Sequence, residues 1–405
     1  MGRTESVKTG GILRGEEDAR QANFLELFFD LVLVFALNGV VTRVVQDLFS
    51  ESVWTRWLSL LYTVVLALPL LWLWTTTAHI TSRFSHRSRW IQLIVLLSTF
   101  GLLIMAASLP YAFVARGAAF AVPYVLLHAG RPLLLRPLLR KHEALRRLYT
   151  RKAIWFSATG VLWFWGATAR DDERVVLWSI AITVDLIVGR YGWPVPGMRQ
   201  LPASAWAMTS SRHLPERYEQ LLLIALGETM LAIGLSYVSH PATPAATAIL
   251  VITFLSTVLM WRIYFYRAGQ VLAEAIALSA NREAAGRTVG TAHVLMVLGS
   301  LGVAAGSKIA LAHPGGHTRP AWLAVILGGP AVFLLGRAQL ERIVFNRVSR
   351  RRMVGIGTLF LLAPPLVLAP PLLAATTAVA VLLGIAVADA RHAAGRPPEA
   401  PSPAV

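Results

Sequence analysis

The sequence predicts an all-α protein that crosses a membrane many times. Its composition is one reason, because 56% of the 405 residues are hydrophobic and only 15% are charged, whereas soluble domains have about 25% charged residues. A second reason is a series of apolar runs near the length of about 20 residues that a spanning helix needs. We predict a bundle of about 12 helices, with about 10–12 as the supported range, at residues 24–48, 57–78, 90–109, 112–128, 153–169, 175–189, 218–238, 246–266, 288–312, 321–340, 353–368 and 371–388.

The placement of the basic residues is a third reason. Cytoplasmic loops of membrane proteins carry an excess of Lys and Arg. If the amino terminus is cytoplasmic, 30 of the 38 basic residues lie in the terminal segments and loops of that side, and the opposite side holds four. This asymmetry predicts that both termini are cytoplasmic. The arginine-rich loops at 131–152 and 337–352 are also predicted to contact anionic lipids.

Composition and missing motifs exclude several classes of function. The formal net charge is +17, but the basic residues lie in short segments between apolar runs, so we expect no nucleic-acid partner. The chain has no cysteine, which excludes disulfides and thiolate chemistry. It contains no Walker A loop, which excludes an ATP-driven pump within this chain. No signal peptide, metal site or cofactor is predicted, and whether the chain is an enzyme stays open.

A faint internal repeat divides the predicted bundle into two halves. With a shift of 190 residues, Glu26 aligns with Glu216 and Asn38 aligns with Glu228. Each segment begins a block of six predicted spans, so the two six-helix repeats would share one orientation and be related by an axis along the membrane normal. The predicted organisation is a cytoplasmic segment 1–23, a first half 24–189, a cytoplasmic connecting loop 190–217, a second half 218–388 and a disordered cytoplasmic tail 389–405.

Acidic side chains inside predicted spans are the main candidates for function, because a charge within a bilayer must be paired, neutralised or exposed to cavity water. Glu26 and Asp30 lie four residues apart near the start of the first span, so a helix presents both on one face. Glu228 lies ten residues into the seventh span. Its expected partners are Arg262 and Lys308. A buried pair that only stabilises the bundle is the competing interpretation.

Other polar residues are weaker candidates. His213, Glu216 and Arg217 lie at the predicted cytoplasmic mouth of the seventh span, where they could bind a proton or simply form a solvated helix start. Asp185 and Asn38 are predicted to line a cavity. The 13 tryptophans mostly lie near predicted span ends, which is typical of an interfacial aromatic belt.

The chain also resembles a known family, the low-temperature-requirement A proteins of bacteria. The resemblance is carried by ELFFDLVLVFAL at Glu26–Leu37, WLWTTTAHITSRF at 72–84, LIMAASLPYAF at 103–113, HLPERYEQLLLIALGE at 213–228, WRIYFY at 261–266 and AHVLMVLGSLGVAAG at 292–306. Ser85, His86 and Tyr266 stand where acidic residues are expected, which puts in doubt any cation site that depends on those positions. The family's name implies a role in growth at low temperature, and the resemblance implies no particular reaction.

These features together predict a secondary transporter, or permease. Asp30 and Glu228 would line a central polar cavity and couple the movement of a proton or cation to that of an unidentified small solute. Two alternatives stay open: a cation channel of two six-helix repeats, and an intramembrane enzyme that modifies a lipid or isoprenoid.

Overall fold

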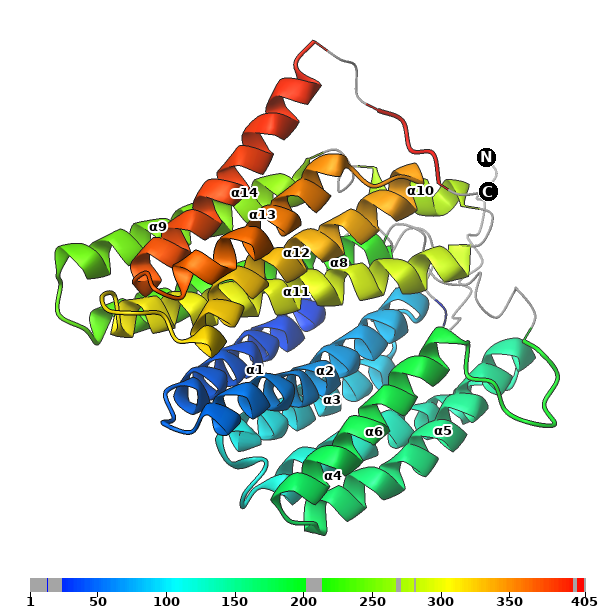
Figure 1. The fold of residues 1–405 in the computed structure, drawn as a ribbon. Coiled ribbons are helices and arrows are strands. Elements are labelled where there is room, and N and C mark those ends of the chain that lie inside the picture. Colours follow the sequence, from blue (N-terminus) through cyan, green and yellow to red (C-terminus); the bar gives the residue numbers. More distant parts are fainter. Residues whose placement is uncertain are drawn as a thin grey trace, which may run out of the picture.

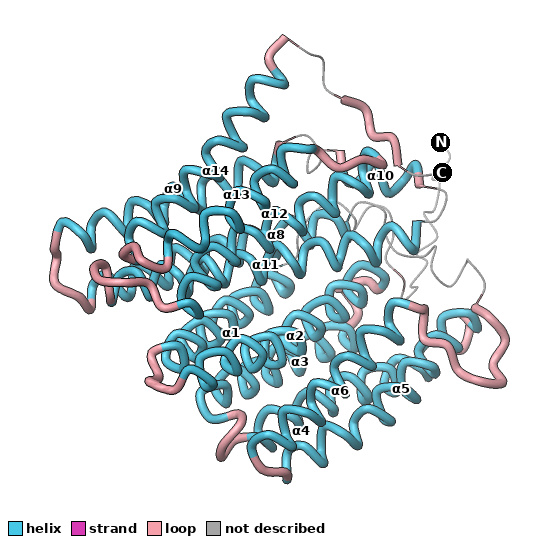
Figure 2. The backbone as a smooth tube through the Cα atoms, viewed as in Figure 1, coloured by secondary structure: helices cyan, strands magenta, loops and turns pink. Residues whose placement is uncertain are grey.

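The computed structural model describes residues 13, 24–201, 213–266, 271–279, 282–395 and 399–403. Most of the predicted amino-terminal segment and part of the predicted connecting loop lie outside these residues. The described regular structure is helical throughout (Figure 2). Its first six long helices are α1 (Phe24–Leu48), α2 (Val53–Arg83), α3 (Arg89–Ser108), α4 (Gly117–Leu135), α5 (Glu143–Thr168) and α6 (Asp171–Arg190). The remaining helices are α8 (His213–Val238), α9 (Pro244–Phe265), the short α10 (Leu272–Leu278), α11 (Arg282–Ala312), α12 (Pro320–Phe345), α13 (Arg350–Leu366) and α14 (Pro371–Ala393).

Nine helices of the described chain are long and apolar enough to cross a membrane, so the protein is a multi-pass membrane protein. A helix also covers each of the other three predicted spans, but α5 and α6 carry charged residues in their first turns and α13 has only 17 residues. The predicted count of 12 spans therefore stays a prediction. The helix starts follow local signals: the Ser52 side chain accepts a hydrogen bond from the Thr55 amide and caps α2.

Two helix boundaries differ from the prediction in ways that matter. Helix α8 begins at His213 rather than at residue 218, so the charged residues before 218 belong to the helix. Helix α14 continues to Ala393, beyond the predicted end of the last span at 388. After this helix, the amide of Ser402 donates a hydrogen bond to the carbonyl of Val344, so part of the predicted tail lies against α12.

The helices of the two predicted halves have similar neighbours (Figure 1). In the first half, α1 packs against α2 and α3, α4 against α3 and α5, and α6 against α5 and α2. In the second half, α8 packs against α9 and α11, α12 against α11 and α13, and α14 against α13 and α9. The halves meet mainly where α1 contacts α8 and α11, and where α2 contacts α8.

Small and aromatic residues both build the interior. A Cβ atom added to Gly302 would lie 2.7 Å from the Cα atom of Gly329, so glycine at these positions lets α11 and α12 approach closely. Trp74, Trp163 and Trp178 are fully buried, so for these three the predicted position in an interfacial belt is wrong. The polar NH of an indole needs a partner inside a protein, and for Trp74 that partner is a carboxylate described below.

Candidate functional site

The polar side chains of α1 form one line along the contact with the second half of the protein. Glu26, Asp30, Asn38 and Thr42 are separated by multiples of four residues, so they lie on one face of the helix. Each of the four forms a hydrogen bond or ion pair with a residue of α8 or α11. Val34 occupies the position between Asp30 and Asn38 in this four-residue spacing, and its side chain is apolar. We call these contacts the α1 polar line.

Glu26 forms the first contact of the line. Its carboxylate Oε2 lies 3.2 Å from Nε2 of His213, in the first turn of α8. The other ring nitrogen of His213 lies 2.9 Å from Oγ of Ser82 on α2. All three side chains are buried. The contact therefore ties α1, α2 and α8 together at one end of the interface.

Asp30 forms the strongest contact, a bidentate ion pair with Arg217 of α8. The guanidinium atoms Nη1 and Nη2 donate to the two carboxylate oxygens over 2.7 and 2.9 Å. Nε1 of Trp74 donates to the same carboxylate over 2.9 Å, and the guanidinium carbon lies 5.3 Å from the Trp74 ring centroid. Gln220 accepts a further bond of 2.7 Å from Arg217. Both oxygens of Asp30 are therefore engaged, as the stability of a buried ion pair requires, whereas Nε of Arg217 is buried without a hydrogen-bond partner among the described residues.

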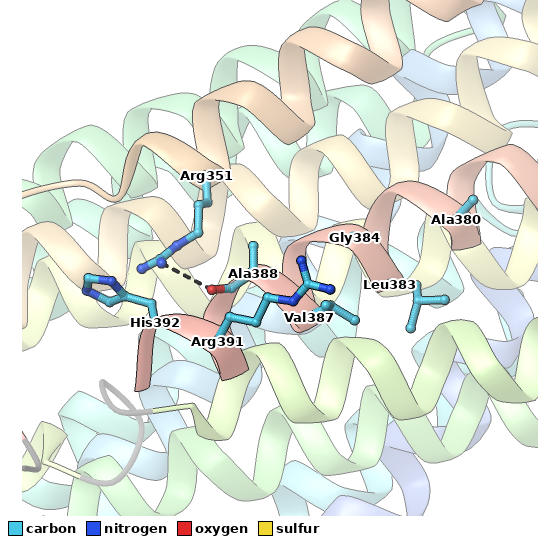
Figure 3. Close-up of a pocket in the computed structure, with 8 residues that line it drawn as sticks. All are labelled: Arg351, Ala380, Leu383, Gly384, Val387, Ala388, Arg391 and His392. Atoms are coloured by element: carbon cyan, nitrogen blue, oxygen red, sulfur yellow. Dashed lines mark hydrogen bonds between the residues drawn. The ribbon is translucent and has the colours of Figure 1, made fainter. Parts of the chain in front are cut away.

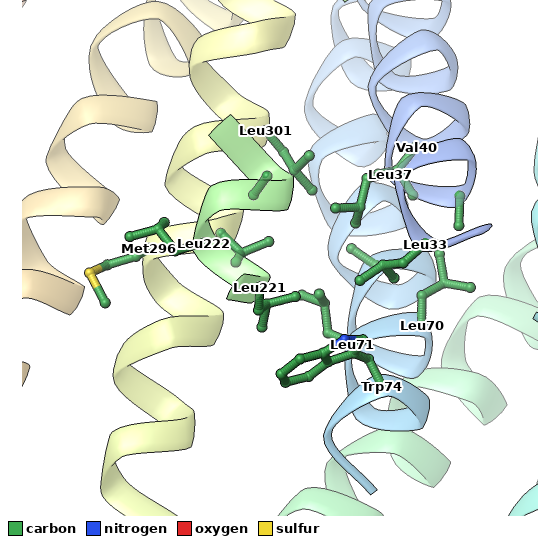
Figure 4. Packing of buried hydrophobic residues seen from close by; sticks show 14 of the residues in the cluster. Leu33, Leu37, Val40, Leu70, Leu71, Trp74, Leu221, Leu222, Met296 and Leu301 are labelled. Carbon is green, nitrogen blue, oxygen red and sulfur yellow. The ribbon is translucent and has the colours of Figure 1, made fainter. Parts of the chain in front are cut away.

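An apolar layer separates this ion pair from the rest of the line (Figure 4). Leu33 and Leu37 of α1 lie toward the second half, where Leu221 of α8 is on the near side and Leu222 lies beside Met296 of α11, and all of these side chains are fully buried. Eight residues separate Asp30 from Asn38, which corresponds to about 12 Å along the helix axis. Because every α1 residue from Leu31 to Leu37 is apolar, no polar side chain of the α1 polar line lies within this layer.

Glu228 lies beyond the apolar layer and is completely buried on α8. Its Oε1 accepts a hydrogen bond of 3.3 Å from Nδ2 of Asn38, whereas its Oε2 has no hydrogen-bond partner among the described residues. Lys308 of α11 lies close enough to attract Glu228 electrostatically, while its ammonium group donates to Oγ1 of Thr42 over 3.2 Å. A half-satisfied carboxylate in an apolar interior is costly, so this environment favours its neutral form or a bound cation.

The other predicted site residues lie apart from this line. Glu216 is exposed in the first turn of α8. Arg262 is exposed in the last turn of α9, and no hydrogen bond or ion pair joins it to Glu228, so the expected pairing of these two residues is not found. Asp185 is buried inside the first half, where it accepts hydrogen bonds of 2.8 Å from Tyr124 and 2.7 Å from Thr159. Asp30 and Glu228 lie on one interface, where α1 contacts α8, and the apolar layer lies between them.

Sequence reasoning missed part of the site. Arg217 and His213 are candidates from the sequence only as residues at a helix mouth, because the helix was expected to begin after them. Their spacing could have indicated their role. His213 and Arg217 are four residues apart, as are Glu26 and Asp30. Two adjacent helices can therefore place the basic pair opposite the acidic pair. For Trp74 no sequence signal separates a buried indole from an interfacial one. Among the described residues, no group of three or more potential ligands could hold a metal ion.

The fold and the α1 polar line define a polytopic α-helical membrane protein with a buried, charged interface between its two halves. The sequence profile of the bacterial low temperature requirement A protein (LtrA) family matches residues 21–387. The chain therefore belongs to the LtrA family. It is also 30% identical over 352 residues to an uncharacterized protein of Rhizobium meliloti (strain 1021), an alignment that covers 86% of this chain and 84% of that protein. No solved structure gives a significant match.

Proposed function

We propose that this protein is a secondary transporter in which Glu228 carries the coupling proton or cation for an unidentified small solute. The observation that supports this role most directly is the environment of Glu228: a fully buried carboxyl group with one oxygen held by Asn38 and the other without a partner among the described residues. A carboxyl in this setting gains more from binding a proton or cation than one whose oxygens are already saturated.

The neighbours of Glu228 suggest how it would release and rebind its cargo. When Glu228 is neutral, Lys308 is held by its bond to Thr42. When Glu228 loses its proton or cation, the ammonium group of Lys308 supplies a compensating charge nearby. Asn38 is neutral and can donate to the carboxyl group in either state. Lys308 and Asn38 therefore compensate the negative charge of Glu228 when it is ionised, and when Glu228 is neutral the half-buried ammonium group of Lys308 keeps its hydrogen bond to Thr42.

The ion pairs of Glu26 and Asp30 would act as the closed gate of this transporter. They join α1 of one half to α8 of the other, and the apolar layer of Leu33, Leu37 and Leu221 lies beside them (Figure 4). Transporters of this kind open by rocking one half against the other around a central site. In this mechanism, opening toward that end requires the Asp30–Arg217 pair to separate, while Glu228 stays in place.

A two-fold repeat would give this mechanism its symmetry, and three observations support one. The helices of both halves have similar neighbours. Asn38 and Glu228, which align in the sequence repeat, also touch, as equivalent residues do beside a two-fold axis. Arg131 of α4 donates to Thr76 and Thr77 of α2. In the equivalent place, Arg337 of α12 donates to the carbonyls of Ile263 and Tyr266 at the end of α9.

We further propose twelve spans, with both termini on the cytoplasmic side of a bacterial inner membrane. The excess of basic residues on one side of the predicted topology supports this orientation. Reporter fusions at each connecting loop test this orientation. A reporter that folds only in the cytoplasm is active only when its loop lies on the cytoplasmic side of the membrane. A reporter in the turn at residues 169–170, between α5 and α6, is decisive. A cytoplasmic location there would remove two of the twelve spans.

The transport proposal is tested with purified protein in liposomes that contain a pH-sensitive dye. An imposed proton gradient and membrane potential should produce a flux in the wild type. Glu228→Gln should lower this flux at least about tenfold, whereas Glu216→Gln, an exposed glutamate of the same helix, should leave it unchanged. Equal fluxes in the wild type and Glu228→Gln would overturn the role of Glu228. Discrete single-channel currents in planar bilayers would instead identify a channel.

A further inference from the structure

A groove lies on the outer surface of α14, far along the chain from the α1 polar line (Figure 3). It has a volume of about 800 Å³. Ala380, Gly384 and Ala388 are spaced by four residues, so they lie on one face of α14 and form its floor. Leu383 and Val387 flank this floor and are exposed by 50% and 39%. The greater part of the groove is therefore apolar and open to the surroundings of the protein.

One end of the groove is basic. Arg391 lies there on the last turn of α14 with His392, and Arg351 approaches from α13. Arg351 is anchored, because its Nε lies 3.0 Å from Oδ1 of Asp389 and its Nη1 donates to the carbonyl of Ala388 over 3.3 Å. Arg391 is exposed and forms no ion pair with a described residue. The groove therefore presents one fixed and one extended guanidinium group at the same end.

Buried ion pairs behind the groove do not neutralise this end. Arg352 lies 2.7 Å from Asp389 and 3.1 Å from Glu341, and Arg337 lies 3.2 Å from Glu341. Together with Arg351 and Arg391, these residues make four arginines against two carboxylates, an excess of two positive charges. Because both carboxylates are already engaged with Arg337, Arg351 and Arg352, neither pairs with Arg391.

The length of the groove matches one leaflet of a bilayer. Eleven residues separate Ala380 from Arg391, which is about 16 Å along a helix. One leaflet contributes about half of the hydrocarbon thickness of about 30 Å. Arg391 lies in the last turn of a helix that is long and apolar enough to span the membrane, so it lies near the level of the lipid headgroups. The apolar part of the groove then lies beside the acyl chains.

We propose that this groove is a binding site for an anionic phospholipid. Its phosphate would lie between Arg351 and Arg391, and an acyl chain would lie on the floor formed by Ala380, Gly384 and Ala388. A second copy of the chain suits the groove less well. Small residues do permit close helix contact, but a symmetric contact between the same faces would bring the two basic ends together.

The test uses the full-length protein in detergent, with lipid binding measured by native mass spectrometry and by the shift in apparent Tm. Phosphatidylglycerol and phosphatidylcholine with identical acyl chains are compared, and inorganic phosphate is added in a separate arm. We expect phosphatidylglycerol to bind more tightly than phosphatidylcholine, and inorganic phosphate alone to give no stabilisation. Arg391→Gln should weaken phosphatidylglycerol binding about fivefold, the effect expected of one basic residue at a membrane surface.

Two glycine variants distinguish a block of the groove from a general loss of protein stability. A Cβ atom added to Gly384 meets no atom within 4 Å, and the same is true of Gly357 on α13, which is exposed outside the groove. Gly384→Leu should fill the groove and lower phosphatidylglycerol binding at least about tenfold without loss of folding, since leucine favours a helix. Gly357→Leu should bind like the wild type.

Three outcomes would overturn the lipid site. The first is equal binding of the two lipids by the wild type, and the second is unchanged binding by Gly384→Leu. The third is a change in oligomeric state with Gly384→Leu, measured by size-exclusion chromatography with light scattering. That result would show that the groove is a contact between copies of the chain. None of these outcomes bears on Glu228, because no step of the transport proposal uses this groove.

Discussion

Asp30 and Glu228 are both buried carboxyl groups on the interface between α1 and α8, but their surroundings differ. Asp30 accepts three hydrogen bonds, two from Arg217 and one from Trp74. Glu228 accepts one hydrogen bond, from Asn38, among the described residues. The donors around Asp30 stabilise its charged form, whereas Glu228 has fewer donors to stabilise a negative charge. The comparison teaches that two equally buried carboxyl groups can differ in how far their oxygens are satisfied, and the transport proposal assigns the mobile proton or cation to the less satisfied one.

The largest expected effect comes from removing the partner of Asp30. Arg217→Ala leaves an uncompensated carboxylate inside the protein, and breaking a buried pair costs about 3–5 kcal/mol. We expect a loss of unfolding free energy in this range, measured by denaturant titration in detergent micelles. The double variant Asp30→Asn with Arg217→Ala is the control, and it should recover part of the loss because no charge stays buried. A loss below about 1 kcal/mol in the single variant would show that the pair is not a clamp.

A smaller effect is expected when the charge is kept but the geometry is changed. Arg217→Lys retains the positive charge and loses the two parallel bonds that only a guanidinium group offers a carboxylate. One lost charged hydrogen bond is worth about 1.5–3 kcal/mol, so the variant should fall between the wild type and Arg217→Ala. The same denaturant titration measures it. If lysine were as stable as arginine, attraction between opposite charges, rather than bidentate bonding, would hold the two halves together.

Trp74→Phe tests the third donor to Asp30. The phenyl ring keeps much of the buried apolar area but removes the Nε1 hydrogen bond of 2.9 Å. A loss of about 1.5 kcal/mol is expected, at the lower end for a bond to a charged group, because Arg217 still neutralises the carboxylate. Trp163→Phe is a matched control, since Trp163 is equally buried but lies away from Asp30. A greater loss in the control would mean that ring packing, not the bond to Asp30, sets the result.

The smallest expected effect on stability is that of Glu228→Gln. Glutamine keeps the shape and the acceptor for Asn38 but removes the charge, so the unfolding free energy should change by less than about 1 kcal/mol. Proton flux in liposomes should nevertheless be lost. The expected result, unchanged stability with lost flux, contrasts with that for Arg217→Ala, whose main expected effect is a loss of unfolding free energy. If Glu228→Gln were instead as destabilised as Arg217→Ala, Glu228 would be a structural anion like Asp30, and the contrast between them would fail.

Much of the fold follows from local properties of the chain. The apolar runs locate the helices because a backbone in lipid must satisfy its own hydrogen bonds, and the basic residues predict which loops share a side. The four-residue spacing of Glu26 and Asp30 correctly predicts a shared helix face, because that spacing depends only on helix geometry. Helix ends are less certain. The charged residues before 218 suggest a loop, but buried partners on α1 keep them within α8.

The partners of the charged side chains were decided by tertiary structure. The sequence by itself determined that the protein is a helical membrane protein and that Asp30 and Glu228 need partners, since the cost of a buried charge is a property of the residue and its surroundings. It did not determine that Arg217 would pair with Asp30 or that Asn38 would bond to Glu228, and of the two expected partners of Glu228, Lys308 lies near it and Arg262 does not. The bonds of Asp30 to Arg217 and of Asn38 to Glu228 join residues 187 and 190 positions apart, and only the packing of α1 against α8 brings them within bonding distance.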